Sequence, residues 1–177
     1  LIGPNGAGKT TLFNLISAAL KPKPGRIIFE GKDITPLPAF KICRLGIART
    51  FQTVKIFPTV PVVRNVMVGA LFGTGHHMSS SEARMKAEEA LEFVDMTAYK
   101  SLPAGDLTLA QQKRLELARA LASQPKLLLL DELMAGLTPT EVSEAMNDVA
   151  EIRKRGITIV MIEHVMQAIM KISDRIV

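Results

Sequence analysis

Cysteine is almost absent from this chain, since Cys43 is the only one among 177 residues. A single cysteine cannot form an internal disulfide, which excludes a small disulfide-held scaffold and fits a reducing compartment such as the cytosol. Histidine is nearly as scarce, and the three histidines lack cysteine or aspartate partners at the spacing of a zinc site. We therefore expect neither a disulfide framework nor a structural zinc centre.

Long hydrophobic runs and blocks of like charge are also missing. The longest apolar stretches, at residues 127–130 and 157–162, have the length of strands and fall far short of the ~20 residues that a membrane-spanning helix needs. The net charge is +5, but the basic residues are scattered, which predicts an ordinary solvated surface and no nucleic-acid partner. The chain also begins without an initiating methionine, so we expect a fragment of a longer protein.

Strands are predicted wherever apolar residues form short continuous runs. Residues 127–130 and 157–162 have the pattern of buried strands, and residues 47–52 predict another. A short hairpin is expected over residues 26–34, around Gly31. Strands that alternate with helices favour an α/β fold, in which a parallel sheet is covered on both faces.

Helices are predicted between these strands. A helix over residues 9–20 is expected to bury Leu12, Leu15, Ile16 and Ala19, and further helices are expected after Ser79 and over residues 107–121. Another begins at Thr138, where an N-cap, a proline and a glutamate follow in the order of a helix start. The helical stretch before residue 127 is too long for a simple crossover, so residues 53–123 are predicted to form an inserted helical subdomain.

A phosphate-binding loop is indicated near the beginning of the chain. Residues 3–10 read Gly-Pro-Asn-Gly-Ala-Gly-Lys-Thr, which matches the P-loop pattern G-x-x-x-x-G-K-[ST] in its strand–loop–helix context. Glycines let backbone N–H groups approach the phosphates, Lys9 can reach the β- and γ-phosphates, and the Thr10 hydroxyl can bind Mg²⁺. The residues expected to contact the nucleotide here are Gly3, Asn5, Gly6, Ala7, Gly8, Lys9, Thr10 and Thr11. A P-loop alone predicts nucleotide binding without telling kinases, GTPases and motors apart.

Two adjacent carboxylates follow the apolar run 127–130. Ligands of open α/β sheets bind at the carboxyl ends of the strands, where Asp131 and Glu132 stand. Asp131 suits the Mg²⁺ shell, and Glu132 suits a general base that activates or positions water for attack on the γ-phosphate. Two solvated acids at a strand end would be the simpler interpretation, but a P-loop in the same chain argues against it.

His164 follows the next predicted strand directly. An imidazole at this end of the sheet could hydrogen-bond the γ-phosphate and sense its presence. A lone histidine is more often structural, but its place beside the two carboxylates favours a functional role.

Taken in order, these motifs resemble the ABC ATPase family over essentially the whole chain. The resemblance implies a P-loop NTPase with a RecA-like parallel sheet, so residues 1–177 are expected to be one ABC ATPase domain that is truncated at both ends. It also implies that Gln52 contacts Mg²⁺ or the attacking water and couples to membrane subunits. The motifs are the P-loop, Gln52 after Thr50-Phe51, the signature Leu107-Thr108-Leu109-Ala110-Gln111, Asp131-Glu132 and Glu163-His164.

The signature departs from the usual Leu-Ser-Gly-Gly-Gln of the family. Thr108 keeps a hydroxyl, whereas Ala110 replaces a glycine whose N–H should approach the nucleotide of an opposing subunit. Thr108 and Gln111 also form a capping-box pattern that could begin any helix, although a capped helix N-terminus is itself an anion site. We expect Thr108, Ala110 and Gln111 to contact nucleotide with altered activity, and the catalytic part of Thr138 in the D-loop stays open.

Finer detail is similar to the ATPases of branched-chain amino acid importers. The stretches that carry this likeness are residues 46–52, 117–121, 134–141, 162–166 and 173–176. The resemblance implies ATP hydrolysis with Mg²⁺, a head-to-tail homo- or heterodimer, transmembrane permease subunits, an indirect link to a substrate-binding protein, and a peripheral place on the cytoplasmic face of the membrane. The alternatives are an importer ATPase for urea or another small amide, and a soluble ABC protein that transports nothing. An ABC protein of the DNA-repair type needs a coiled-coil or zinc-bearing insertion, and one of the translation type needs a second ATPase domain. The chain shows neither feature.

Overall fold

Seven α-helices, two 3-10 helices and five strands make up the described part of this computed structural model. It describes residues 1–4 and 6–177, with the side chains of all of these except 167 and 168. In chain order the elements are α1 (Lys9–Ile16), β1 (Ile28–Phe29), β2 (Lys32–Asp33), α2 (Ala39–Arg44), β3 (Ile47–Arg49), α3 (Val62–Gly73), α4 (Ser80–Phe93), η1 (Thr97–Tyr99), η2 (Ala104–Asp106), α5 (Leu109–Ala122), β4 (Leu127–Asp131), α6 (Pro139–Lys154), β5 (Thr158–Ile162) and α7 (Met166–Ile172). Among these residues no helix has both the length and the hydrophobicity to cross a membrane.

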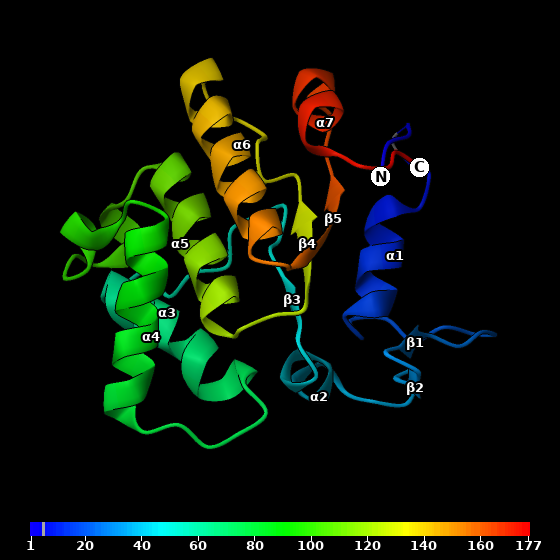
Figure 1. Ribbon diagram of the computed structural model, residues 1–177, viewed down its shortest axis with the longest axis horizontal. Coiled ribbons are helices and arrows are strands. Elements are labelled where there is room, and N and C mark those ends of the chain that lie inside the picture. Colours follow the sequence, from blue (N-terminus) through cyan, green and yellow to red (C-terminus); the bar gives the residue numbers. More distant parts are fainter. Residues whose placement is uncertain (5) are drawn as a thin grey trace.

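The central sheet is parallel, with the strand order β3-β4-β5 (Figure 1). Leu127 of β4 pairs with Ile47 on one side and with Thr158 on the other. Three strands are therefore in register and end at one edge of the sheet, which confirms the parallel strands predicted from the sequence. The predicted hairpin is also present, as the antiparallel pair β1 and β2.

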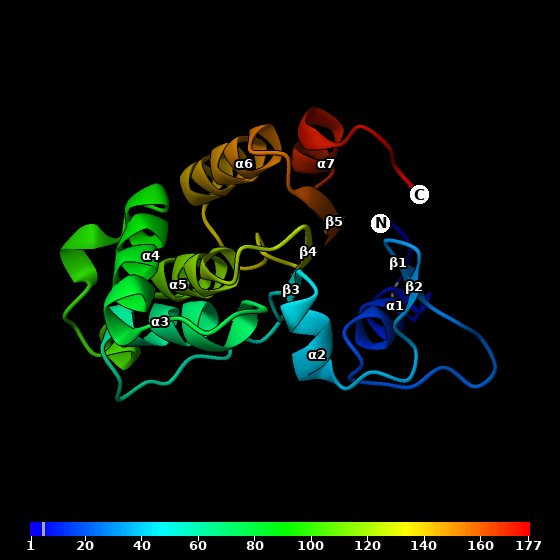
Figure 2. The same cartoon turned by 60° about the horizontal axis from the view of Figure 1, so that its bottom comes forward.

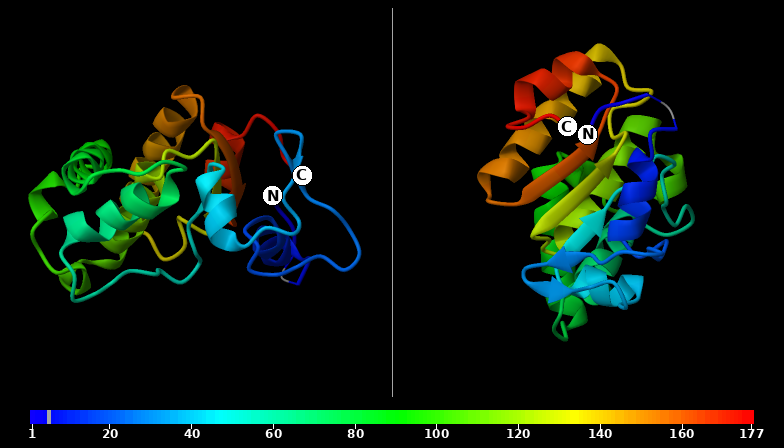
Figure 3. Two further views of the ribbon diagram at one scale, coloured as in Figure 1. Left: turned by 90° about the horizontal axis from the view of Figure 1, so that it is seen from below. Right: turned by 90° about the vertical axis from the view of Figure 1, so that its right-hand side faces the viewer.

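Both faces of this sheet are covered by helices. Successive side chains of β4 point to opposite faces, so they contribute to two separate cores. Leu128 and Leu130 belong to the larger core, together with Val149 and other residues of α6. Leu129 belongs to a smaller core that contains Phe13 of α1. The right-hand view of Figure 3 shows α1 on one side of the sheet and α6 with α7 on the other. By the same alternation, the side chain of Asp131 faces the α1 side.

Helix α1 differs from its predicted form. It ends at Ile16 because Ala18 takes a left-handed backbone conformation with φ 57°. The side chain that it buries against the sheet is Phe13, whereas Leu12 is 42% exposed. The prediction that Leu12 lies on the buried face is therefore wrong. Apolar spacing along so short a segment does not determine which side chain meets the sheet.

Helices α3, α4 and α5 pack against one another on the side of the sheet away from α1 (Figures 1 and 2). Two glycines of α3 allow a very close approach to α5. A β-carbon added to Gly69 would lie 2.1 Å from the carbonyl oxygen of Arg119, and one added to Gly73 would lie 2.3 Å from Cβ of Ser123. The C-terminal half of α5 is thus held close against α3 by helix packing.

Candidate active site

The phosphate loop ends in an uncapped helix N-terminus. Gly8 is the N-cap of α1 and has φ 84°, a left-handed conformation that favours glycine, and this N-cap residue supplies no side-chain hydrogen bond to the first amide groups of the helix. The Lys9 ammonium donates hydrogen bonds to the carbonyl oxygens of Gly3 at 2.7 Å and Pro4 at 3.0 Å. One cation and free backbone N–H groups therefore meet at this loop, which fits the phosphates of a nucleotide.

The other predicted loop residues lie around this point. Gly3 is half-buried, whereas Gly6, Ala7, Thr10 and Thr11 are exposed. A β-carbon on Gly6 or Gly8 would meet no atom within 4 Å, so the space above the loop is open. Asn5, also predicted to contact the nucleotide, lies outside the described residues.

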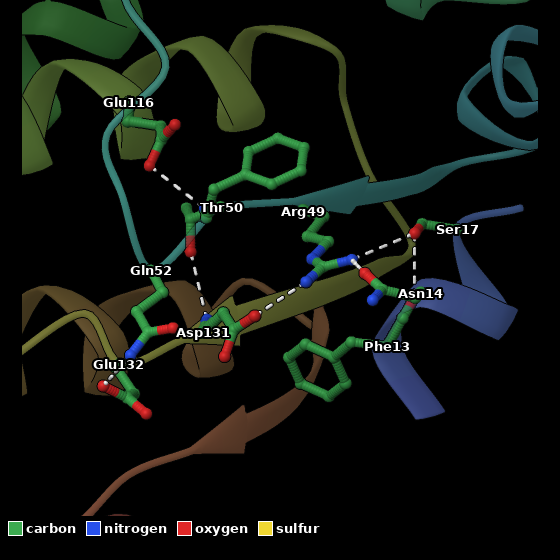
Figure 4. A network of polar contacts seen from close by, with 10 residues as sticks. Phe13, Asn14, Ser17, Arg49, Thr50, Gln52, Glu116, Asp131 and Glu132 are labelled. Atoms are coloured by element: carbon green, nitrogen blue, oxygen red, sulfur yellow. Dashed lines mark hydrogen bonds and ion pairs between the residues drawn. The ribbon is translucent and has the colours of Figure 1, made fainter. Parts of the chain in front are cut away.

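Three segments far apart in the sequence converge on the carboxylate of Glu132. Gln52, which follows β3, donates from Nε2 to Oε2 of Glu132 at 2.9 Å (Figure 4). His164, which follows β5, has its Nε2 3.2 Å from Oε1 of Glu132. Parallel strands bring these residues together because their carboxyl ends meet at one edge. The three residues predicted as catalytic thus form one cluster.

Asp131 lies beside this cluster and is paired with Arg49. Its side chain is 1% exposed, and one Arg49 guanidinium nitrogen donates to its Oδ2 at 2.7 Å. The other Arg49 terminal nitrogen donates to Asn14 at 2.6 Å and to Ser17 at 3.2 Å, both near the end of α1 (Figure 4). Arg49 therefore ties the P-loop helix to the acidic strand end.

Asp131 keeps an unused acceptor for a metal ion. Its Oδ1 is buried and has no hydrogen-bond partner among the residues that the structure describes. Carboxylate and hydroxyl oxygens are the hard ligands that Mg²⁺ prefers. The buried Oδ1 of Asp131 and the exposed hydroxyl of Thr10 therefore fit this ion, and Gln52 reaches the same region through Glu132.

The predicted signature residues stand elsewhere. Thr108 caps α5 by accepting a hydrogen bond from the amide of Gln111, whose own side chain accepts from the amide of Thr108, so the predicted capping box is confirmed. Ala110 lies in the first turn of the same helix. Figures 1 and 2 place α5 and the P-loop helix α1 well apart. Within one chain the signature residues therefore stand away from the phosphate loop.

Sequence reasoning missed two charged residues that organise this region. Arg49 is one, and Glu116 of α5 is the other (Figure 4). The buried carboxylate of Glu116 accepts from the amides of Phe51 at 3.1 Å and Lys55 at 3.0 Å. Burial raises the pKa of Glu116, although these hydrogen bonds and Arg119 oppose the change. The only signal in the sequence was a charged residue at a position where an apolar one is expected: Arg49 in an apolar strand and Glu116 on the apolar face of a helix. Glu116 fastens the segment that carries Gln52 to the helix that carries the signature.

Comparison with known proteins agrees with this geometry. A family model described as "ABC transporter" matches residues 1–135. The chain is 40% identical over 190 residues to the high-affinity branched-chain amino acid transport ATP-binding protein BraF of Pseudomonas aeruginosa, and the match covers 100% of this chain and 74% of BraF.

Solved structures of similar fold include nucleotide-bound cassettes. The ADP conformation of an ATP-binding cassette of an ABC transporter matches with a TM-score of 0.85 and 36% identity, over 98% of this chain and 72% of the other. A dimeric post-hydrolysis cassette bound to ADP and Pi matches with a TM-score of 0.83 and 26% identity, over 94% and 74%.

Proposed function

The chain belongs to the ABC transporter family of ATP-binding proteins, and on that basis we propose that it hydrolyses ATP to drive import of branched-chain amino acids. The observation that carries the catalytic part is the cluster of Gln52, Glu132 and His164 at the carboxyl edge of the sheet. This cluster stands beside the buried Asp131, which Arg49 joins to α1, the helix that follows the phosphate loop.

Nucleotide binding is assigned to the phosphate loop and Asp131. The Lys9 ammonium and the free amide groups at the start of α1 bind the β- and γ-phosphates. Thr10 and Asp131 hold Mg²⁺, with Gln52 as a further contact. When bound, this ion neutralises charge that develops on the phosphate oxygens.

Water activation is assigned to Glu132. Its carboxylate accepts the proton of the attacking water. Gln52 contacts Oε2 of this carboxylate and His164 contacts Oε1, so the two side chains fix its orientation. His164 is 48% exposed, so it can also reach a phosphate oxygen from the opening of the site. Binding and water activation are thus assigned to different side chains, and this separation can be tested.

The test replaces Glu132 by glutamine, which keeps the shape and removes the basic charge. We expect phosphate release by Glu132→Gln to fall about 10²–10⁴-fold, while calorimetric titration shows ATP affinity within a few-fold of the original protein. Glu89→Gln, the same change at a residue that is 63% exposed on α4, is the control. An unchanged hydrolysis rate would remove Glu132 as the base. Loss of ATP binding would instead place it in the metal site.

A second subunit completes the site in this proposal. Thr108, Ala110 and Gln111 stand apart from the phosphate loop of their own chain, and a similar cassette is described as dimeric. In a head-to-tail homo- or heterodimer the start of α5 faces the nucleotide of the partner. Ala110→Gly removes the β-carbon that crowds this contact, so ATP-dependent dimers on size-exclusion chromatography should increase.

Permease subunits are the proposed membrane partner, so the chain acts on the cytoplasmic face of the membrane and reaches a substrate-binding protein only indirectly. An apolar hollow of about 390 Å³ lies between α2, α3 and α5, at the boundary of the proposed helical subdomain, residues 53–123. Three phenylalanines line it and are unusually exposed: Phe40 at 56%, Phe51 at 39% and Phe72 at 61%. A helix of the permease would cover them.

The transport proposal is tested by copurification and uptake. The tagged protein should retain permease subunits, and Phe72→Asp should release them without changing ATP affinity. Cells that carry this protein with its permease subunits and substrate-binding protein should take up labelled leucine, and Lys9→Ala should abolish that uptake. Uptake of urea in place of leucine would support the small-amide importer, and absence of any membrane partner would support a soluble ABC protein.

A further inference from the structure

Lys113 is a buried lysine on α5, two residues beyond the signature. Its side chain is 5% exposed, and its ammonium donates to the carbonyl oxygens of Glu132 at 2.9 Å, Leu133 at 2.9 Å and Ala135 at 2.7 Å. An ammonium has three N–H donors, and each of them is used by a backbone carbonyl of one turn. Lys113 thus binds the turn that begins with Glu132.

Burying the Lys113 ammonium costs free energy, because the charge loses its contact with water. Burial lowers the pKa of Lys113, although the carboxylates of Glu163, Glu132 and Glu116 oppose that change. Among the residues that the structure describes, no carboxylate oxygen lies within 4.0 Å of the Lys113 ammonium. An apolar side chain would fill this position without desolvating a charge. The same replacement would leave the carbonyl oxygens of Glu132, Leu133 and Ala135 without these donors, so the ammonium fixes the backbone of this turn at an electrostatic cost.

The turn that Lys113 holds has an unusual backbone. Glu132 has φ 51°, a left-handed conformation that a residue with a β-carbon seldom adopts and that persists only when its surroundings impose it. From the opposite side, the amide of Glu132 donates to the carbonyl of Ile162 at 2.9 Å. The buried Glu163 carboxylate accepts from the amide of Met134 at 2.8 Å. The turn is thus fixed between α5 and the end of β5.

We propose that Lys113 is a positioning residue that sets the direction of the Glu132 carboxylate and makes the Glu132 turn move together with α5. The proposal rests on the proposed function of Glu132 as the base. Thr108 is the N-cap of the same helix and Ala110 lies in its first turn, so both are within about one and a half turns of Lys113. A shift of α5 when its N-terminus meets a nucleotide therefore reaches the Glu132 carboxylate of its own chain through three hydrogen bonds.

The test is Lys113→Met, which keeps an unbranched apolar side chain and removes all three donors. We expect kcat for ATP hydrolysis to fall about 10–100-fold, since a misplacement near 1 Å can cost 10²-fold, with ATP affinity within about threefold. Amide hydrogens of residues 132–135 should exchange faster with solvent. Lys154→Met, the same change at a side chain that is 71% exposed, is the control. Lys113→Arg retains donors and should recover part of the rate.

A double variant separates this proposal from that for Glu132. If Lys113 acts through Glu132, Lys113→Met should add little to the loss already caused by Glu132→Gln. A full additional loss in that background would overturn the positioning role, and so would wild-type kcat or unchanged exchange in Lys113→Met. Parallel loss of ATP binding and thermal stability would show a structural role only. Wild-type hydrolysis by Glu132→Gln alone would contradict the proposed base, while exchange at residues 132–135 would still report whether Lys113 holds the turn.

Discussion

Replacement of Arg49 by methionine should destabilise the protein strongly, although Arg49 is not among the residues predicted to bind nucleotide or metal or to act in catalysis. Arg49 and Asp131 are 6% and 1% exposed, and the Arg49 nitrogen is the only described hydrogen-bond donor to the Asp131 side chain. Arg49→Met keeps apolar contact with Phe13 and Phe51, over whose rings the guanidinium lies, but leaves a buried carboxylate uncompensated. Breaking a buried pair in this way costs about 3–5 kcal/mol.

Urea unfolding followed by circular dichroism measures this loss. For a chain of this size it corresponds to a melting temperature lower by roughly 6–20 °C. Arg153→Met is the control, because Arg153 and its partner Asp174 are 53% and 71% exposed and surface pairs contribute less than about 1 kcal/mol. The double variant Arg49→Met with Asp131→Asn removes both charges and should recover most of the stability. A loss as small as that of Arg153→Met would refute the reasoning, and a double variant no better than the single one would assign the loss to packing.

Two further changes test the packing and the electrostatics of α5. Gly69→Ala places a β-carbon 2.1 Å from the Arg119 carbonyl oxygen, so the helices must separate and stability should fall by about 1–3 kcal/mol or more; an unchanged melting temperature would contradict this packing. Burial raises the pKa of Asp148 to about 6, against the opposing effect of Arg114. The folded state therefore binds this proton more tightly, and the stabilisation is complete below about pH 4 and lost as the pH rises through 6. The stability of Asp148→Asn relative to the original protein should rise by on the order of 3 kcal/mol between pH 4 and pH 7. If urea unfolding gives the same stability difference between the two proteins at both pH values, the raised pKa of Asp148 is excluded.

Local patterns predicted much of the fold because the interactions behind them span only a few residues. The predicted capping box at Thr108 and the predicted helix start at Thr138 are present, and the helix expected after Ser79 also begins with a capping box, formed by Ser79 and Glu82. Apolar runs predicted β4 and β5 because a strand buried on both faces has little choice of composition. The same runs placed Asp131, Glu132 and His164 at one edge of the sheet, since parallel strands end together. The roles of these residues stay predictions.

The contacts that orient the candidate site join residues far apart in the chain, and no local pattern specifies them. Arg49 meets Asp131 across 82 positions, and Lys113 reaches the Ala135 carbonyl across 22. The order of residues shows that a lysine stands at position 113 of α5 but not that all three of its donors are used by one turn. Likewise, α1 buries Phe13 and leaves Leu12 exposed, because the sheet beneath the helix selects its buried face. Residue chemistry and spacing thus indicate what can bind and react here, whereas tertiary packing decides which charge faces which carboxylate and how Glu132 is aimed.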